Sequence, residues 1–301
     1  MPFLHTPYAS GKPPFAVGLA PLDLIRWIEQ DECLAQQLAL KETILAQERA
    51  AAFGALAGSE AGQAEVLALL AAHLPAHFPQ TYRREGGALR ILAADRLVAL
   101  SSEPALLTAS RLVQEDLLLM QRREQGWSLV AGSLCFPSTW VLAEKLGLAM
   151  DAIHDPVPGY AGKMAATIAR IFDNLKVDQP VERLNWSIYS DARLRYAQSK
   201  QDPLERFPPG QPVSERAHIR VERQTLRRLP RSGDILFTVR VHVDPVAAFA
   251  RDPRGRELAQ ALRDQLAALN SAQLAYKGIV EARGRLLDAL AALAQGSRDK
   301  A

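Results

Sequence analysis

The segment from residue 219 to residue 243 constrains the fold most strongly, because it has the pattern of a β-hairpin. Two runs rich in β-branched and aromatic residues flank the cluster Leu229-Pro-Arg-Ser-Gly-Asp234, whose composition is typical of a turn. If the turn closes with Leu229 opposite Asp234, the antiparallel register places Arg223 directly across from Arg240. The sequence therefore predicts a hairpin with two arginines facing each other on neighbouring strands.

The two faces of this hairpin differ in chemistry, because successive side chains of a strand point to opposite sides of a sheet. One face carries Glu222 and Gln224 among apolar residues, where a carboxylate is costly unless it meets a partner or a ligand. The other face carries the apposed arginines, whose like charges repel, so we expect an anion beside them. Either a ligand supplies this anion, or Glu182 or Asp191 neutralises the arginines while Glu222 pairs with one of them. A register slip of one residue would exchange the two faces.

Composition limits the classes of function. The chain has 301 residues and a net charge of +3, which alone is too small to indicate nucleic-acid binding, and no RNA- or DNA-binding motif is present. Cys33 and Cys135 are the two cysteines, too few for a disulfide framework or an iron–sulfur cluster. The start lacks the basic and apolar regions of a signal peptide, and no apolar run reaches the length of a membrane span. We therefore expect a cytoplasmic protein with no nucleic-acid or membrane partner.

Hydrophobic periodicity predicts helices at both ends of the chain and strands between them. The predicted strands lie within 88–135 and 184–243, and the predicted helices span 22–53, 60–73, 162–176, 253–269 and 272–294. Ser138 is expected to cap a further short helix that stops at Gly147. The predicted fold class is α+β, with one antiparallel sheet wrapped by N-terminal helices (about 20–80) and C-terminal helices (about 253–295). We expect a single domain over residues 1–301.

Common catalytic motifs are absent from the sequence, including the P-loop, G-x-G-x-x-G after a strand, H-E-x-x-H and G-x-S-x-G. His73 and His77 have the spacing of two metal ligands on a helix, but Pro75 between them is expected to end that helix. Cys135 and His154 are a conceivable catalytic pair, but Cys135 stands in an apolar strand, where a buried thiol is usually inert. Neither pair is therefore favoured as a site.

His154 has the most suggestive setting of the six histidines. Two prolines hold its loop extended and stiff, so the imidazole loses little entropy when it binds a partner. A neutral imidazole near an apolar strand and an apolar helix suits an axial ligand of haem iron. Haem is apolar with two carboxylates, and Arg223, Arg227 and Arg240 are the candidates to bind them at the mouth of its slot. A structural role for His154, and iron ligation by His242 in its place, stay open as alternatives.

Five blocks occur in the order seen in one family: LVQEDLLLM, GSLCFPSTWVLAEKLG, IHDPVPGY, RLNWSIY and RVERQTLRRLPRSGDILFTVRVHVDPV. On these blocks the chain resembles the haem-dependent oxidative N-demethylase family over roughly residues 20–290. The resemblance implies a PAS-like core, in which an antiparallel sheet with helices holds haem b in its ligand cavity. It also implies a monooxygenase reaction: oxidative demethylation of a small, dimethylamine-like secondary amine with dioxygen, releasing formaldehyde. A separate flavin/iron–sulfur reductase subunit is the implied electron donor.

Carried onto this sequence, the resemblance implies His154 as the proximal haem ligand, because it lies in the matching IHxPVP block. Glu222 becomes the candidate partner of the substrate ammonium, and Arg223 and Arg227 become candidate partners of the haem propionates. The hairpin register raises one difficulty, since Glu222 and the arginines face opposite sides and must reach one haem unless a bulge redirects a strand. A PAS-type haem sensor or binding protein without turnover is the alternative function, because it needs the same iron ligand but no substrate carboxylate.

Overall fold

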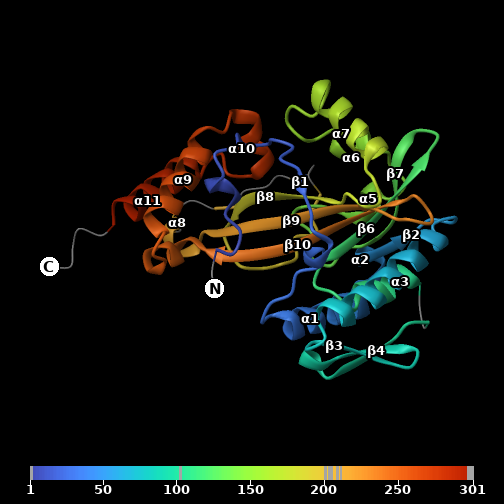
Figure 1. Ribbon diagram of the computed structural model, residues 1–301. Coiled ribbons are helices and arrows are strands. Elements are labelled where there is room, and N and C mark those ends of the chain that lie inside the picture. Colours follow the sequence, from blue (N-terminus) through green and yellow to red (C-terminus); the bar gives the residue numbers. More distant parts are fainter. Residues whose placement is uncertain are drawn as a thin grey trace.

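The computed structural model describes residues 3–101, 104–199, 202, 206–207, 210 and 212–296. Its centre is an antiparallel sheet with the strand order β1-β8-β9-β10-β6-β7-β2 (Figure 1). The strands of this sheet are β1 (Ala20–Pro21), β2 (Phe53–Ala55), β6 (Asp116–Arg123), β7 (Gly126–Ser133), β8 (Val181–Tyr189), β9 (His218–Arg228) and β10 (Ile235–Pro245). An antiparallel sheet combined with helices confirms the α+β class.

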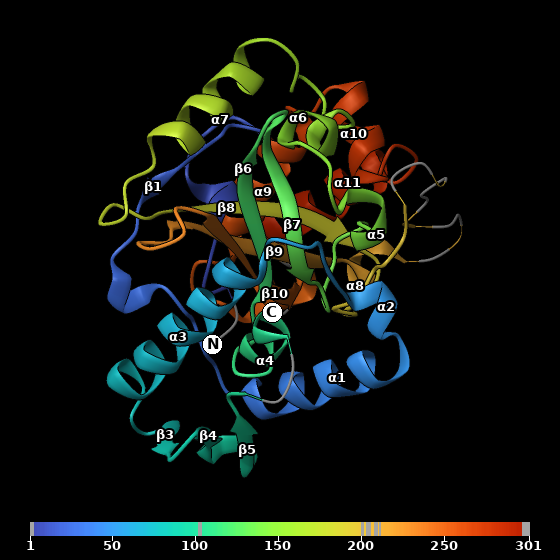
Figure 2. The ribbon, with the colours of Figure 1, turned by 90° about the vertical axis from the view of Figure 1, so that its right-hand side faces the viewer.

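Helices cover both faces of this sheet, which gives the molecule three layers (Figures 1 and 2). One face is covered by α6 (Met150–His154) and α7 (Lys163–Asn174), which follow the short α5 (Leu142–Lys145). The opposite face is covered by elements of the N-terminal half: α1 (Leu34–Gln47), α3 (Glu60–His77), α4 (Ala105–Ser110) and a small sheet of β3 (Tyr82–Glu85), β4 (Ala88–Ile91) and β5 (Arg96–Ala99).

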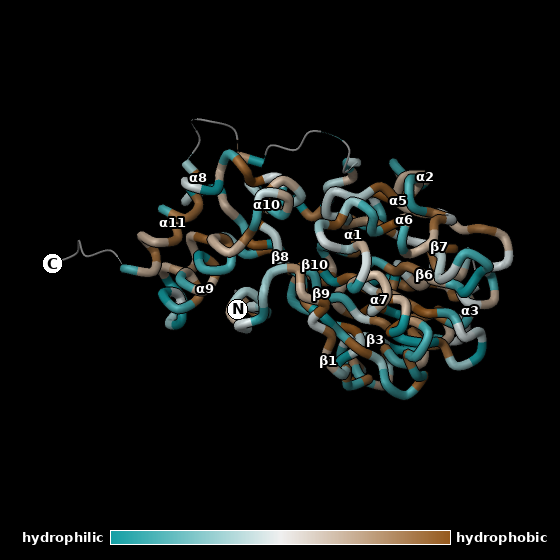
Figure 3. Tube along the Cα trace, turned by 90° about the horizontal axis from the view of Figure 1, so that it is seen from above, coloured by the Kyte–Doolittle hydropathy of each residue, from teal (hydrophilic) through white to brown (hydrophobic). Residues whose placement is uncertain are grey.

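The C-terminal helices gather at one end of the large sheet, away from α3 and α7 (Figure 3). They are α9 (Gly255–Ala267), α10 (Ser271–Lys277) and α11 (Arg283–Gln295). The remaining short elements are α2 (Arg49–Ala52), α8 (Val213–Arg216) and the 3-10 helices η1 (Pro7–Ala9), η2 (Leu24–Arg26), η3 (Leu92–Ala94) and η4 (Val246–Arg251). No helix among the described residues is both long and apolar enough to cross a lipid bilayer.

The β9–β10 hairpin has the register that the sequence predicts. Arg223 stands opposite Arg240, and Glu222 stands opposite Val241. The turn closes where expected, since the Leu229 backbone N–H donates to the Asp234 carbonyl oxygen at 2.8 Å. This confirmed register determines which side chains of the two longest strands share a face.

Both faces are buried at the centre of the sheet, so β6 and β10 each supply side chains to two separate cores. Leu119 on β6 and Leu236 on β10 are fully buried beneath α3 and α4. Leu118, Leu226 and Phe237 point the other way and pack with α7. Burial of one such side chain contributes about 1.5–3 kcal/mol, so the helical layers on both sides are needed to complete the fold.

Several predicted boundaries are wrong. The strands at 88–99 belong to the separate small sheet and not to the large one, because they pair with β3 and with each other. The first long helix begins at Leu34 and not near residue 22, because Asp23 caps only the 3-10 turn η2. The predicted helix over 272–294 is broken after Lys277, where Gly278 adopts a left-handed conformation (φ +64°) that terminates α10.

Two local predictions about single residues are also wrong. Helix α3 continues through Pro75 to His77, so this proline does not end the helix. Ser138 does not cap α5, whose N-cap is Val141. The Ser138 hydroxyl instead accepts a hydrogen bond from Nε of Arg220 at 2.6 Å. A long-range partner, which local sequence patterns do not report, decides the case of Ser138.

Candidate functional site

A cavity of about 300 Å³ lies between the large sheet and the α6–α7 layer. Most of its walls are apolar. The sheet contributes Leu118 and Met120 from β6 with Phe237 and Val239 from β10, and α7 contributes Ile168 and Phe172. The N-terminal arm closes another side with Phe15, Val17 and Leu19. Such an enclosure suits a largely apolar ligand, with specificity left to a few polar groups.

His154 is one of these polar groups and enters the cavity from the end of α6. It therefore ends a short helix, whereas the sequence predicts a stiff loop. Its Nδ1 lies 2.9 Å from the Met150 carbonyl oxygen, and its ring stacks on Tyr160 at a centroid distance of 5.0 Å. A carbonyl oxygen can only accept, so Nδ1 carries the proton and Nε2 has the free lone pair.

The surroundings of His154 keep the imidazole neutral. Burial lowers the pKa of His154, and this effect outweighs the hydrogen bond to Met150, which favours the charged form. A neutral imidazole whose other nitrogen is oriented by a backbone carbonyl is the usual arrangement of a histidine that binds a metal. Nε2 of His154 is therefore the ring nitrogen that is available to a ligand in the cavity.

Glu222 on β9 also lines the cavity, together with Asn185 and Gln224. Oε2 of Glu222 accepts hydrogen bonds from Nε2 of Gln224 at 2.8 Å and from Nδ2 of Asn185 at 3.3 Å. The strand register explains this grouping, because Asn185 of β8 stands directly opposite Glu222. The structure thus brings Glu222 and His154, both singled out from the sequence, to one cavity.

Arg183 also lines the cavity, although the sequence patterns did not single it out as a site residue. Burial lowers the pKa of Arg183, while the nearby Glu222 carboxylate favours its charged form. Its Nε atom is buried and has no hydrogen-bond partner among the described residues. The signal was available in the RLNWSIY block, since Arg183 stands two residues before Asn185 and so shares its face. An unpaired buried guanidinium of this kind is suited to an anionic ligand.

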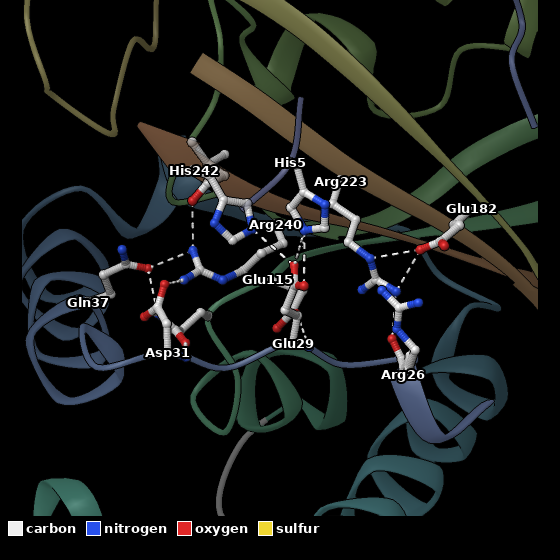
Figure 4. A network of polar contacts seen from close by, with 12 residues as sticks. His5, Arg26, Glu29, Asp31, Gln37, Glu115, Glu182, Arg223, Arg240 and His242 are labelled. Atoms are coloured by element: carbon white, nitrogen blue, oxygen red, sulfur yellow. Dashed lines mark hydrogen bonds and ion pairs between the residues drawn. The ribbon is translucent and has the colours of Figure 1, made fainter. Parts of the chain in front are cut away.

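Arg223 and Arg240 lie on the opposite face of the sheet and do not line the cavity (Figure 4). Nε of Arg223 donates to Oε2 of Glu182 at 2.8 Å, and Arg240 donates to Oδ2 of Asp31 at 2.5 Å. The alternative in which Glu182 neutralises an arginine is therefore the one observed. Asp191 pairs instead with Arg193.

Arg227 is also outside the cavity. Its guanidinium carbon lies 4.2 Å from the ring centroid of Trp27. Trp27 belongs to the core on the face of the sheet that carries Arg223 and Arg240, which we call the arginine face. Together with Arg223 and Arg240, it was predicted to meet the haem carboxylates, but the structure does not bring these three arginines to His154. The physical reason is strand alternation: no bulge interrupts β9 and β10 between residues 218 and 245 to turn them toward the cavity.

His242 lies on the arginine face as well, so the structure does not bring this alternative ligand to the cavity either. Its Nε2 is 3.0 Å from Oε2 of Glu29, which also contacts Nε2 of His5 at 2.9 Å (Figure 4). Burial would raise the pKa of Glu29, but the hydrogen bonds from His242 and His5 outweigh it and hold this pKa well below its ordinary value. Cys135 is buried, which raises its pKa to about 12 and makes the thiol unreactive at neutral pH.

An apolar cavity, one neutral imidazole with a free nitrogen and one unpaired guanidinium fit a haem group, which is apolar with an iron centre and two carboxylates. The cavity thus has the character of a haem-protein pocket.

The comparison of the whole chain with protein families also indicates a haem protein. Residues 18–287 match the model described as haem-dependent oxidative N-demethylase, alpha subunit-like, and the chain belongs to this family. The resemblance seen in the sequence is confirmed, and the family is one of haem-dependent oxidoreductases.

Removing the ion pair between Arg223 and Glu182 should lower the stability of the fold without changing the affinity for haem. Replacing Glu182 with Gln leaves a buried guanidinium without its counter-charge, which costs about 1–3 kcal/mol. We expect this loss in urea denaturation at pH 7, with unchanged haem affinity. Asp95→Asn, in an ion pair with Arg90 in which the Asp95 side chain is 96% exposed, is the control and should change stability little. Unchanged stability with weakened haem binding would contradict the assignment and return Arg223 to the cofactor.

Proposed function

We propose that this protein binds haem b through His154 and catalyses oxidative N-demethylation of a small secondary amine. The observation that carries the proposal is the placement of His154 and Glu222 in one apolar cavity, since an iron ligand and a substrate carboxylate then face the same space. Membership of the family supports the haem and the reaction class. Dimethylamine is the substrate we propose, with formaldehyde as a product.

His154 and Arg183 are the residues that would hold the haem. His154 offers the Nε2 lone pair to the iron, and its Nδ1–H stays fixed on the Met150 carbonyl. Arg183 would pair with a propionate, which gives its buried Nε the partner it lacks among the described residues. This assignment replaces the three arginines of the opposite face. When bound and reduced, the haem would supply the activation of dioxygen.

Glu222 would bind and orient the substrate ammonium. Asn185 and Gln224 both donate to Oε2, so Oε1 is the oxygen that we assign to the ammonium. A carboxylate among apolar walls favours a small cation with methyl groups, because the charge meets Glu222 while the methyl groups contact the apolar side chains. The same carboxylate is positioned to take the ammonium proton before the N-methyl group is oxidised.

A PAS-like core and an external electron donor complete the proposed function. We propose that the antiparallel sheet with its covering helices is a PAS-like core and that the cavity corresponds to the PAS ligand site. Electrons would come from a separate flavin/iron–sulfur reductase subunit, since two cysteines cannot hold a cluster in this chain. A PAS-type haem sensor without turnover would need His154 but not Glu222, so the carboxylate in the cavity favours the enzyme.

Replacing His154 with Ala tests the iron ligand. We expect the purified wild-type protein, reconstituted with haemin, to show a Soret band whose position changes in the variant because the imidazole ligand is lost. Added imidazole should restore the wild-type spectrum. His218→Ala is the matched control, because His218 begins β9 and is not among the residues that line the cavity. An identical spectrum and haem content for His154→Ala would refute the ligand assignment.

Glu222→Gln tests the substrate role. The amide keeps the shape of the side chain but loses the charge, so we expect kcat/KM for dimethylamine to fall about 10–100-fold, which corresponds to the loss of one charge-assisted hydrogen bond. Formaldehyde release with dioxygen and an artificial electron donor measures it, and haem content should stay unchanged. The exposed Glu215→Gln is the control. Undiminished activity would remove Glu222 from the mechanism, and haem binding without any formaldehyde from the wild type would favour the sensor.

Arg183→Gln distinguishes the two assignments of the propionate partner. We expect haemin to bind about 10–100-fold more weakly, because one charge-assisted hydrogen bond to a carboxylate is lost. Arg227→Gln removes an arginine outside the cavity and should leave haemin affinity unchanged. The opposite ranking of the two variants in haemin titrations would show that the arginine face of the sheet contacts the cofactor after all.

A further inference from the structure

Three segments that are distant in the sequence converge on the face of the sheet away from the cavity (Figure 4). His5 comes from the N-terminal arm, Glu29 from the loop before α1, and His242 from β10. Both Nε2 atoms approach the same Oε2 of Glu29, at 2.9 Å for His5 and 3.0 Å for His242. The three side chains are nearly buried, with 11%, 18% and 11% of their surface exposed for His5, Glu29 and His242 respectively.

These ligand atoms have the spacing that a transition-metal ion requires. One nitrogen of each histidine and one oxygen of Glu29 all lie within 4.8 Å of one another. In a tetrahedral zinc site with bonds of about 2.0–2.1 Å, neighbouring ligand atoms are about 3.3 Å apart. A cation between the three groups therefore needs only small side-chain adjustments.

The chemistry of these three groups suits a divalent cation as well as hydrogen bonds. The two imidazole rings are 5.0 Å apart between centroids, and Nε2 of each ring faces the carboxylate of Glu29. Neutral imidazoles and one carboxylate are natural ligands of a divalent cation, which would give Glu29 a counter-charge in a site that is nearly closed to water.

The surroundings fix the central ligand and place two further carboxyl groups near it. The backbone N–H of Glu29 donates to Oε1 of Glu115 at 2.9 Å, which holds Glu29 in place. Oε2 of Glu115 is buried without a hydrogen-bond partner among the described residues. Asp244, two residues beyond His242, lies close enough to interact with both histidines. The two nearby arginines have their own carboxylates, Arg223 with Glu182 and Arg240 with Asp31, and Arg240 also lies close enough to Glu115 to favour its charged form.

We propose that His5, Glu29 and His242 form a binding site for a divalent transition-metal ion, with Zn²⁺ as the cation that fits best. Two nitrogens and one carboxylate oxygen would leave a fourth position for water. The site is separate from the cavity that holds His154, since none of its three residues lines that cavity. It would fasten the N-terminal arm to β10 and to the start of the α1 region.

A cation bound to His5 would also affect the cavity, because the N-terminal arm reaches both sites. Phe15 and Leu19, which follow His5 in the arm, line the cavity on the opposite side of the sheet. The arm therefore contacts both sites, and a metal that anchors His5 would also hold the arm residues against the cavity. Metal bound to the folded state alone stabilises that state by mass action.

Zinc binding to the full-length protein tests the proposal. The wild-type protein and the variants His5→Ala and His242→Asn are treated with EDTA, dialysed and titrated with Zn²⁺ alone, and bound metal is measured by mass spectrometry. We expect one zinc per wild-type chain and a higher melting temperature, and at least about tenfold weaker binding in both variants, since even the loss of an outer-shell partner costs that much. X-ray absorption at the zinc edge should show two imidazole ligands.

The control is His77→Asn, because His73 and His77 form the other close histidine pair, with ring centroids 4.3 Å apart. This variant should retain its zinc. His5→Ala keeps the test valid if His242→Asn folds poorly, since His5 lies in the arm and not in the sheet. No zinc bound to the wild type, or equal zinc affinity in the wild type and His5→Ala, would overturn the proposal.

Discussion

The alternation of side chains along β8, β9 and β10 is the constraint on which the rest of the structure depends. Each strand is buried on both sides, so it must supply one row of side chains to the cavity and another to the layer beneath α1 and α3. Glu222 and Arg223 are neighbours in the chain, yet one faces the cavity and the other an ion pair with Glu182. Two chemically different sites are thereby built from the same strands.

The arginine face shows how like charges are tolerated in the middle of a sheet. Arg223 and Arg240 stand directly opposite each other and are almost completely buried, an arrangement that would be strongly unfavourable for unpaired charges. Each has its own carboxylate, and Arg223 also donates to the backbone carbonyl oxygens of Arg26 and Trp27. Arg183 lies on the cavity face instead, where its Nε atom is buried without a partner among the described residues. Nε of Arg227 and Nε of Arg240 are also without a partner there, so the position of Arg183 in the cavity, and not this atom, separates it from the arginines that support the fold.

Sequence patterns predicted local features well and long-range partners poorly. The hairpin register followed from strand alternation and a turn cluster, and the amphipathic pattern placed α7 within two residues of its observed ends. Glu222 was recognised because a carboxylate in an apolar row is costly. Arg223 and Arg240, which the sequence predicted beside the haem carboxylates, lie on the other face of the sheet with partners that are distant in the chain: Glu182 is 41 residues and Asp31 is 209 residues away. No local pattern reports such pairs, whereas the place of Arg183 on the face of Asn185 follows from strand alternation alone.

The sequence by itself determined the register of the central hairpin, the α+β class and the family, because each depends on order and spacing along the chain. Only the tertiary structure decided which face of the hairpin meets His154, because that depends on where α6 and α7 dock against the sheet. It also decided that His5, Glu29 and His242 meet, since 24 and 213 residues separate Glu29 from the two histidines. Side-chain direction is a property of each strand, whereas the partner on each side is a property of the packed molecule.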